Sequence, residues 1–102
     1  MSARNPDPRN ADGALVRDIL ICNKKGLHAR ASAKFVQTVE RFDAQVKVTR
    51  NSETVGGDSI MGLMMLSAGP GSTITVECAG KEAAEVMDAI AALIEGRFSE
   101  ED

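Results

Sequence analysis

The sequence predicts an α+β fold in which helices pack on one face of an antiparallel β-sheet. Several short segments alternate between apolar and polar residues, which is typical of strands with one buried face. Three other segments repeat apolar residues at helical spacing. The resulting order is strand, helix, strand, strand, helix, strand, helix, which suits a two-layer domain. A ferredoxin-like split arrangement fits this order as well, so the pattern alone leaves two topologies open.

The chain divides into a leader, one domain and a short tail. Residues 1–13 are rich in Pro, Asn and Asp and predict a flexible leader. Residues 14–97 carry the periodic segments and predict the domain, with no internal repeat and no second boundary. Residues 98–102, at the end of "RFSEED", predict an acidic tail.

The first half of the domain begins with a strand and a helix. The run over 15–22 is rich in Leu, Val and Ile and predicts a strand, which "NKKG" then ends. Apolar residues at helical spacing predict a helix of about 12–14 residues between His28 and Phe42. "AQVKVT" (44–49) alternates with a period of two and predicts a strand, and "RNSE" predicts a hairpin turn.

The second half continues with a strand, a helix, a strand and a helix. "TVGG" (54–57) is a weak strand, since two glycines give it little to pack. A short helix is expected over 59–67, with Ser59 as its N-cap, followed by the loop "AGPGS". "TITVECA" (73–79) alternates strongly and predicts a strand. The last helix presents one apolar stripe of Val86, Met87, Ile90, Leu93 and Ile94.

Composition excludes several classes of function. With 102 residues, 43% of them hydrophobic, the chain is large enough for one modest core. A net charge of −3 and the absence of Trp and Tyr argue against a nucleic-acid binder. No segment is apolar enough for a membrane span or a signal peptide, so we expect a cytoplasmic protein. We expect Cys22 and Cys78 to be small buried residues rather than a disulfide.

The segment "KGLHARAS" (25–32) contains the only histidine of the chain, His28. A helix that starts just after His28 would place the imidazole over free backbone N–H groups, which together form a site for an anion. Arg30 lies in the first turn and can add a bidentate cationic partner for phosphate. Gly26 permits an unusual backbone approach, and Leu27 can anchor the loop in the core. Because a neutral imidazole nitrogen is a nucleophile near pH 7, His28 can hold a phosphoryl group covalently.

Two other interpretations of His28 stay open on these residues alone. It can be a surface histidine that merely precedes a helix. It can also be the nucleophile of a small hydrolase, although no carboxylate close in sequence is placed to activate water. Acid–base catalysis is disfavoured because there is no second histidine.

Two stretches resemble one known family. "GLHARASAKFV" is similar to the active-site segment of HPr, the histidine-containing phosphocarrier of the bacterial phosphoenolpyruvate-dependent phosphotransferase system. "DSIMGLMML" resembles the regulatory-serine helix of the same family, at the expected distance downstream. The likeness covers about residues 15–96. It implies an open-faced β-sandwich, with a four-stranded antiparallel sheet and three helices on one face, and it disfavours the ferredoxin-like arrangement.

The resemblance also implies a function. His28 would accept a phosphoryl group from enzyme I and pass it to an enzyme IIA-type acceptor, with Arg30 and the backbone of Ala29 and Arg30 contacting the phosphate. No metal or cofactor is expected, and the protein would be a monomeric carrier rather than an enzyme with its own turnover. The alternative is an HPr-like regulatory binding protein that acts mainly through partner contacts.

The chain departs from the family pattern after the arginine, where proline is usual and Ala31 stands here. Alanine restores a backbone N–H in the first helical turn, so we expect the anion site to survive. This difference and the long leader resemble the nitrogen-type or alphaproteobacterial branch more than the sugar-transport branch.

The second stretch supplies a candidate regulatory site and a docking surface. Ser59 is expected to cap its helix, and the resemblance implies that an HPr kinase/phosphorylase phosphorylates it. The following helix is too apolar to have only one buried face, so some of its methionines must face solvent. Positions that match the family's partner-binding surface are Ala29, Ala33, Ile60, Met61, Met64 and Met65.

Overall fold

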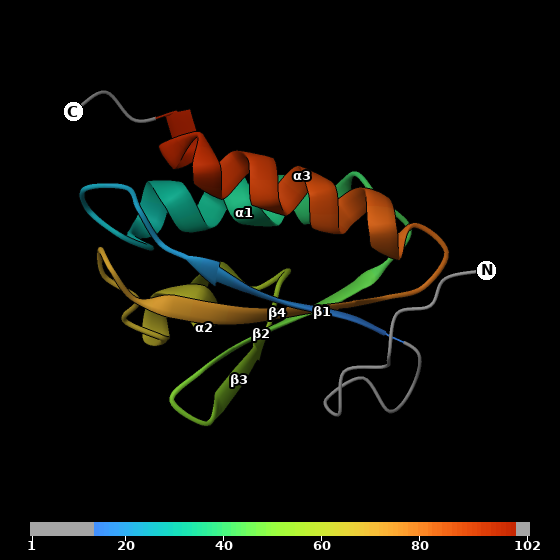
Figure 1. Cartoon of the computed structure of the whole chain (residues 1–102), viewed down its shortest axis with the longest axis horizontal. Helices are drawn as coiled ribbons and strands as arrows, with labels where there is room; N and C mark the ends of the chain where they lie inside the picture. Colours follow the sequence, from blue (N-terminus) through green and yellow to red (C-terminus); the bar gives the residue numbers. More distant parts are fainter. Residues whose placement is uncertain (1–13, 100–102) are drawn as a thin grey trace.

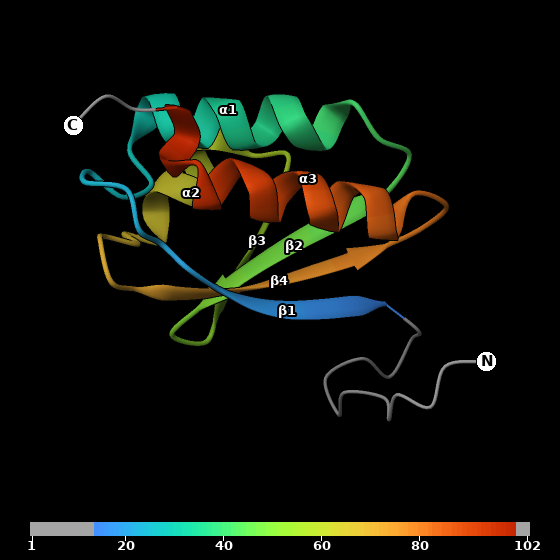
Figure 2. The same cartoon turned by 45° about the horizontal axis from the view of Figure 1, so that its top comes forward.

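The computed structural model describes residues 14–99 and contains an antiparallel four-stranded sheet covered by helices. The elements are β1 (Leu15–Leu20), α1 (Ala29–Glu40), β2 (Gln45–Arg50), β3 (Glu53–Gly56), α2 (Ile60–Met65), β4 (Thr73–Ala79) and α3 (Ala83–Glu95), followed by a 3-10 turn (Arg97–Ser99). Figures 1 and 2 show α1 and α3 side by side above the sheet, and α2 packs against α1 and β3. The expected α+β class, with four antiparallel strands and three helices, is confirmed.

The strand order is β1-β4-β2-β3, with every neighbouring pair antiparallel. The last strand, β4, therefore lies between the first two strands. In a ferredoxin-like split arrangement the third strand would take that place, so this alternative is excluded for the described residues. The central position suits β4, which has seven residues and buries Ile74, Val76 and Cys78 on one face. The short β3 lies at the edge.

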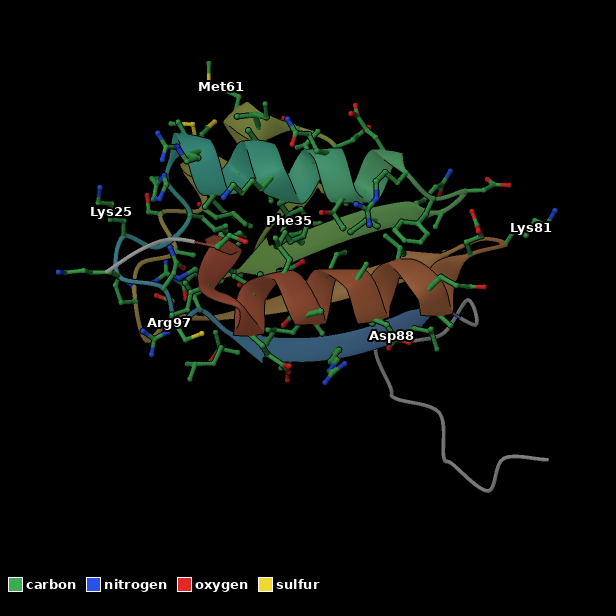
Figure 3. All side chains as sticks on the ribbon, turned by 90° about the horizontal axis from the view of Figure 1, so that it is seen from above. Lys25, Phe35, Met61, Lys81, Asp88 and Arg97 are labelled. Atoms are coloured by element: carbon green, nitrogen blue, oxygen red, sulfur yellow. The ribbon has the colours of Figure 1, made fainter. Side chains whose placement is uncertain are left out.

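The core fills the space between the sheet and the helices. Phe35 of α1 is fully buried, and Figure 3 shows it between α1 and α3. The α3 stripe is buried as predicted at four positions, whereas Leu93 is half-buried. The other large side chains that are fully buried include Ile21, Val48, Leu63, Ile74, Val76, Val86, Ile90, Ile94 and Phe98.

Several element boundaries differ from the sequence prediction. β1 ends at Leu20 rather than at residue 22, and Ile21 instead exchanges backbone hydrogen bonds with the loop at 71–72. α2 has six residues rather than the nine expected over 59–67. α1 ends at Glu40 because the N–H groups of Arg41 and Phe42 turn back to carbonyls three residues earlier. The turn at 50–53 is the predicted hairpin, with positive φ at both central residues, Asn51 and Ser52.

Phe98 belongs to the core, so its prediction as the first residue of the tail was wrong. Arg97, Phe98 and Ser99 all have φ between 55° and 59°, so the chain turns back left-handed after α3. This turn directs the ring inward, and Lys34 Nζ of α1 donates to the Phe98 carbonyl. Residues 1–13 and 100–102 lie outside the described residues, so the leader and the acidic tail stay predictions.

Gly62 lets α2 lie close to β3. A Cβ built at Gly62 would lie 2.9 Å from Val55 Cβ and 3.1 Å from Ser59 Oγ. Ordinary side chains do not approach so closely, so any larger residue must push α2 away from β3.

We predict that Gly62→Ala destabilises the domain by about 1–3 kcal/mol because the overpacking against Val55 exceeds the gain in helix propensity. Urea unfolding followed by circular dichroism measures the change. Gly69→Ala is the matched control, since a Cβ there meets nothing within 4 Å and should leave stability near that of the wild type. Equal stability of the two variants would contradict this account of the α2–β3 contact.

Candidate functional site

His28 is the N-cap of α1, as expected from a helix that starts directly after it. Its backbone is extended, with φ −79° and ψ −177°, and its side chain turns back over the first helical turn. The ring nitrogen Nδ1 accepts hydrogen bonds from the backbone N–H of Arg30 at 3.2 Å and of Ala31 at 3.4 Å. A nitrogen that accepts two N–H groups carries its lone pair rather than a proton. The geometry therefore directs the nucleophilic lone pair of Nδ1 at the amino end of α1.

The loop before His28 is fixed against the loop that follows α2. Leu27 is buried, and its N–H donates to the Ala68 carbonyl at 2.9 Å. Gly26 has φ +67°, and a Cβ there would lie only 2.4 Å from the Ala68 oxygen. Only glycine combines this backbone angle with this close approach. The expectations for Gly26 and Leu27 are both confirmed.

The surroundings of His28 in the chain are basic. Between Ile19 and Val39 the sequence contains Lys24, Lys25, Arg30 and Lys34 but no Asp or Glu. Figure 3 shows Lys25 at the end of the molecule where α1 begins, with Arg97 at the same end. The positive end of the helix dipole adds to these charges. The chain on both sides of His28 is therefore basic, although the whole chain carries a net charge of −3.

Arg30 contributes to this site in two ways. Its backbone N–H is one of the two donors to Nδ1, while its side chain is exposed and accessible to a bound anion. Ala29 begins α1 and is exposed as well. Their predicted contacts with phosphate remain expectations, since the observed acceptor of the amides is the imidazole itself.

Ala31 and Asn23 belong to the site although neither was predicted as a site residue. Ala31 donates to Nδ1, and an N-cap side chain commonly bonds the amide three residues later, so its position relative to His28 was a usable signal. Asn23 is fully buried and its Nδ2 donates to the Gly26 carbonyl at 2.8 Å. Nothing in the sequence marks a loop asparagine as buried.

The α2 surface is apolar and exposed, as predicted. Met61 and Met65 are 71% and 67% exposed, and Ile60 and Met64 are about 40% exposed. We call these four residues the α2 patch. Leu63 and Leu66 of the same segment are buried in the core, whereas Ile60 and Met64 stay partly exposed. Figure 3 shows Met61 projecting outward beside α1.

The α1 residues predicted for docking lie on the helix against which α2 packs. Ala29 is exposed and Ala33 is half-buried. Together with the α2 patch they form one candidate docking surface, whose binding role stays a prediction.

Ser59 is the N-cap of α2, as expected. Its Oγ accepts from the Gly62 N–H at 3.0 Å, and the residue is half-buried, so the hydroxyl combines a structural role with partial access. Its phosphorylation stays a prediction.

The two cysteines differ from each other. Cys78 is buried as expected, and burial raises the pKa of its thiol to about 11, with a further contribution from the Glu77 carboxylate. Cys22 is exposed, so the prediction that it is buried was wrong: the strand ends before it, and its Sγ donates to the Ile94 carbonyl at the end of α3. The two thiols are free and do not form a disulfide.

Two kinds of feature are absent from residues 14–99. No group of three or more His, Cys, Asp or Glu side chains is placed to hold a metal ion within this range. Nor does any helix in the same range have the length and apolar character that crossing a membrane requires.

Comparisons with known proteins agree on one family. A family model described as "PTS HPr component phosphorylation site" matches residues 15–96. The phosphocarrier protein HPr of Cupriavidus necator is 56% identical over 86 residues, covering 84% of this chain and 97% of that protein. The phosphocarrier protein NPr of Shewanella violacea is 41% identical, covering 84% and 94%. The crystal structure of an HPr from Thermoanaerobacter tengcongensis superimposes with a TM-score of 0.82 at 39% identity, covering 86% of this chain and 99% of that one.

Proposed function

The chain belongs to the HPr family, and on that premise we propose that it is a phosphocarrier of the phosphotransferase system whose His28 holds the phosphoryl group. The observation that carries the proposal is the position of Nδ1, which faces the backbone N–H groups of Arg30 and Ala31. The matching family model is itself described by a phosphorylation site. The carrier takes part in a relay and has no turnover of its own.

In the proposed step, the lone pair of His28 Nδ1 attacks the phosphorus of phosphorylated enzyme I. A nitrogen–phosphorus bond forms as the bond between the phosphorus and enzyme I breaks, and the electron pair of that bond stays on enzyme I. The reverse chemistry delivers the phosphoryl group to an enzyme IIA-type acceptor. No metal or cofactor is needed, because His28 supplies the nucleophile and the site supplies positive charge.

After transfer, the backbone N–H groups that donate to Nδ1 in the unphosphorylated protein can bind the phosphoryl group. Once Nδ1 carries phosphorus it can no longer accept, and the phosphoryl oxygens become the acceptors for the N–H groups of Arg30 and Ala31. We propose that Ala29 adds a further amide and that the Arg30 guanidinium adds charge. The phosphoryl oxygens thereby take the place of the imidazole nitrogen as stronger acceptors, so the N–H groups of Arg30 and Ala31 keep a hydrogen-bond partner.

Partner docking is proposed for the α2 patch with Ala29 and Ala33. A carrier must bind a donor and an acceptor in turn and release each of them, which favours a small contact over a permanent interface. Exposed methionines are flexible and polarizable and can fit partners of different shape. Such contact would bring partners over the first turn of α1, since α2 packs against that helix.

Ser59 is proposed as a regulatory site for an HPr kinase/phosphorylase. A phosphate on its Oγ would stand at the amino end of α2, where negative charge is tolerated, and would add about two negative charges beside the docking surface. We further propose that the protein acts in the cytoplasm as a monomer. Assignment to the nitrogen-type branch also stays a prediction, since relatives named HPr and NPr are both similar to this chain.

Incubation with phosphoenolpyruvate and enzyme I should add the mass of one phosphoryl group, which mild acid removes. His28→Ala should add none while keeping the circular dichroism spectrum of the folded protein. Intact-mass spectrometry measures both. Persistence of the product in neutral buffer would disfavour a hydrolase. If the wild type stays unmodified but still captures a regulator, the alternative of an HPr-like binding protein is favoured.

Ala31→Pro should shorten the lifetime of the phosphohistidine at neutral pH by about fivefold, because it removes one N–H donor worth roughly 1 kcal/mol. Proline is sterically acceptable in the first helical turn, so the fold should be kept. Ala31→Gly is the matched control, since it alters the same position but retains the N–H. Phosphorus NMR follows the decay, and identical lifetimes in the two variants would show that the Ala31 amide does not bind the phosphoryl group.

Ser59→Asp should slow phosphate uptake from enzyme I about tenfold by repelling the donor, with little loss of thermal stability because Asp is a good N-cap. Stopped-time intact-mass measurements give the rate. Gln45→Glu adds the same charge at an exposed position at the start of β2, beyond the far end of α1 from His28, and should change the rate less. Equal slowing by both substitutions would argue for a general charge effect.

A further inference from the structure

We propose that Asn23 is a positioning residue for His28 and acts through the carbonyl of Gly26. The inference rests on the proposed function, because it concerns the placement of the ring nitrogen that would accept phosphorus. Asn23 lies ahead of the motif that resembles the family's active-site segment and supplies no nucleophile and no charge. Its contribution is to hold the loop that carries the histidine.

Burial makes the Asn23 side chain an unusual component of this loop. It is fully buried, and only Ser32 and Thr38 are further polar residues buried among those the structure describes. Burying an amide without a partner costs about 1–3 kcal/mol, whereas an aliphatic side chain of similar size would carry no such cost. The hydrogen bond from Nδ2 to the Gly26 carbonyl, at 2.8 Å, is therefore the reason why an amide suits this position.

The same carbonyl also binds the backbone of His28. The His28 N–H donates to the Gly26 oxygen at 2.9 Å, and a carbonyl oxygen has a lone pair for each of the two donors. The two bonds fix the plane of the peptide group that follows Gly26. On the other side, the Ala68 oxygen lies too close to Gly26 to allow that residue to shift towards it.

The fixed peptide group determines where the imidazole stands. The His28 N–H points at the Gly26 oxygen, the backbone of His28 is extended, and its side chain is directed back over α1. Nδ1 then reaches the amides of Arg30 and Ala31. Without the Asn23 amide, the peptide group is held by one bond fewer and the ring can turn away from the amides. A small displacement of a reacting atom is enough to slow a transfer step strongly.

The test compares Asn23→Ala with Thr38→Val, which removes another buried hydrogen bond, from Thr38 Oγ1 to the Lys34 carbonyl, in the second half of α1. Nitrogen-15 NMR at mildly alkaline pH measures the imidazole tautomer. The wild type and Thr38→Val should carry the proton on Nε2, whereas Asn23→Ala should show a mixture of tautomers. A merely structural loss of stability, monitored by thermal melting, would not distinguish the two variants in this way.

The second readout is the rate of phosphorylation by phosphoramidate, which needs no protein partner. Nδ1 forms its bond to phosphorus as the phosphorus–nitrogen bond of phosphoramidate breaks and ammonia leaves. Asn23→Ala should react about tenfold more slowly than the wild type, and Thr38→Val within about twofold of it. The proposal is overturned if Asn23→Ala keeps both the tautomer and the rate of the wild type, or if Thr38→Val slows the reaction equally.

Two further results separate the alternatives. If Asn23→Ala does not fold, hydrogen exchange in the wild type is measured instead. The side-chain amide protons of Asn23 should exchange much more slowly than those of the exposed Gln37 and Gln45. Equal exchange overturns the proposal. If the wild type takes up no phosphate on His28, the proposed function fails. The tautomer comparison, which requires no phosphate, then still decides whether Asn23 positions the ring.

Discussion

The amides in the first turn of α1 need an acceptor that the helix itself cannot provide, and the structure meets this need with the imidazole of His28. This arrangement depends on the rest of the fold. The apolar face of α1, centred on Phe35, packs into the core and fixes the direction of the helix axis. The amino end then emerges where the loop from β1 arrives, and the ring nitrogen and the amides lie within hydrogen-bond distance of each other.

Backbone hydrogen bonds to a distant segment hold this loop, in addition to the side chains of Asn23 and Leu27. Ile21 bonds the loop at 71–72, and Leu27 bonds Ala68. Both partners belong to the segment between α2 and β4, so the loop that carries His28 packs against a part of the chain some 40 to 50 residues later. The insertion of β4 between β1 and β2 brings these two segments together. Topology, and not local sequence, therefore provides the support for the site.

Charge and apolar surface are separated around α1. The residues of the loop and the first turns supply cations without a neighbouring acid in sequence, while α2 supplies an exposed apolar patch. The proposed anion site and the proposed docking surface therefore lie on different parts of the two packed helices α1 and α2. Gly62 keeps α2 close to β3, which buries Leu63 and turns the methionines outward. A short helix with two apolar faces can in this way serve both the core and a surface.

Local properties were predictable from the sequence alone. The start of α1 after His28, the left-handed Gly26, the cap at Ser59 and the exposure of the α2 methionines depend on near neighbours in the chain, where helical period and cap chemistry act. The motif around His28, together with the stretch "DSIMGLMML" at the expected distance downstream, was sufficient to identify the family. Apart from Phe98, which belongs to the core, the division into leader, domain and tail stays a prediction. The roles of the site residues also stay predictions, because a role depends on the molecules that the site meets.

The tertiary structure alone decided the place of β4, the burial of Asn23 and Phe98, and the exposure of Cys22. Each depends on contacts between segments far apart in sequence, such as Lys34 with Phe98 and Cys22 with Ile94. The local sequence predicts that Asn23, a polar loop residue, and Phe98, an aromatic residue in an acidic segment, are exposed. Both are buried because segments distant in sequence cover them. The local sequence pattern indicates which environment a residue prefers, whereas its burial depends on which other segments of the chain pack against it.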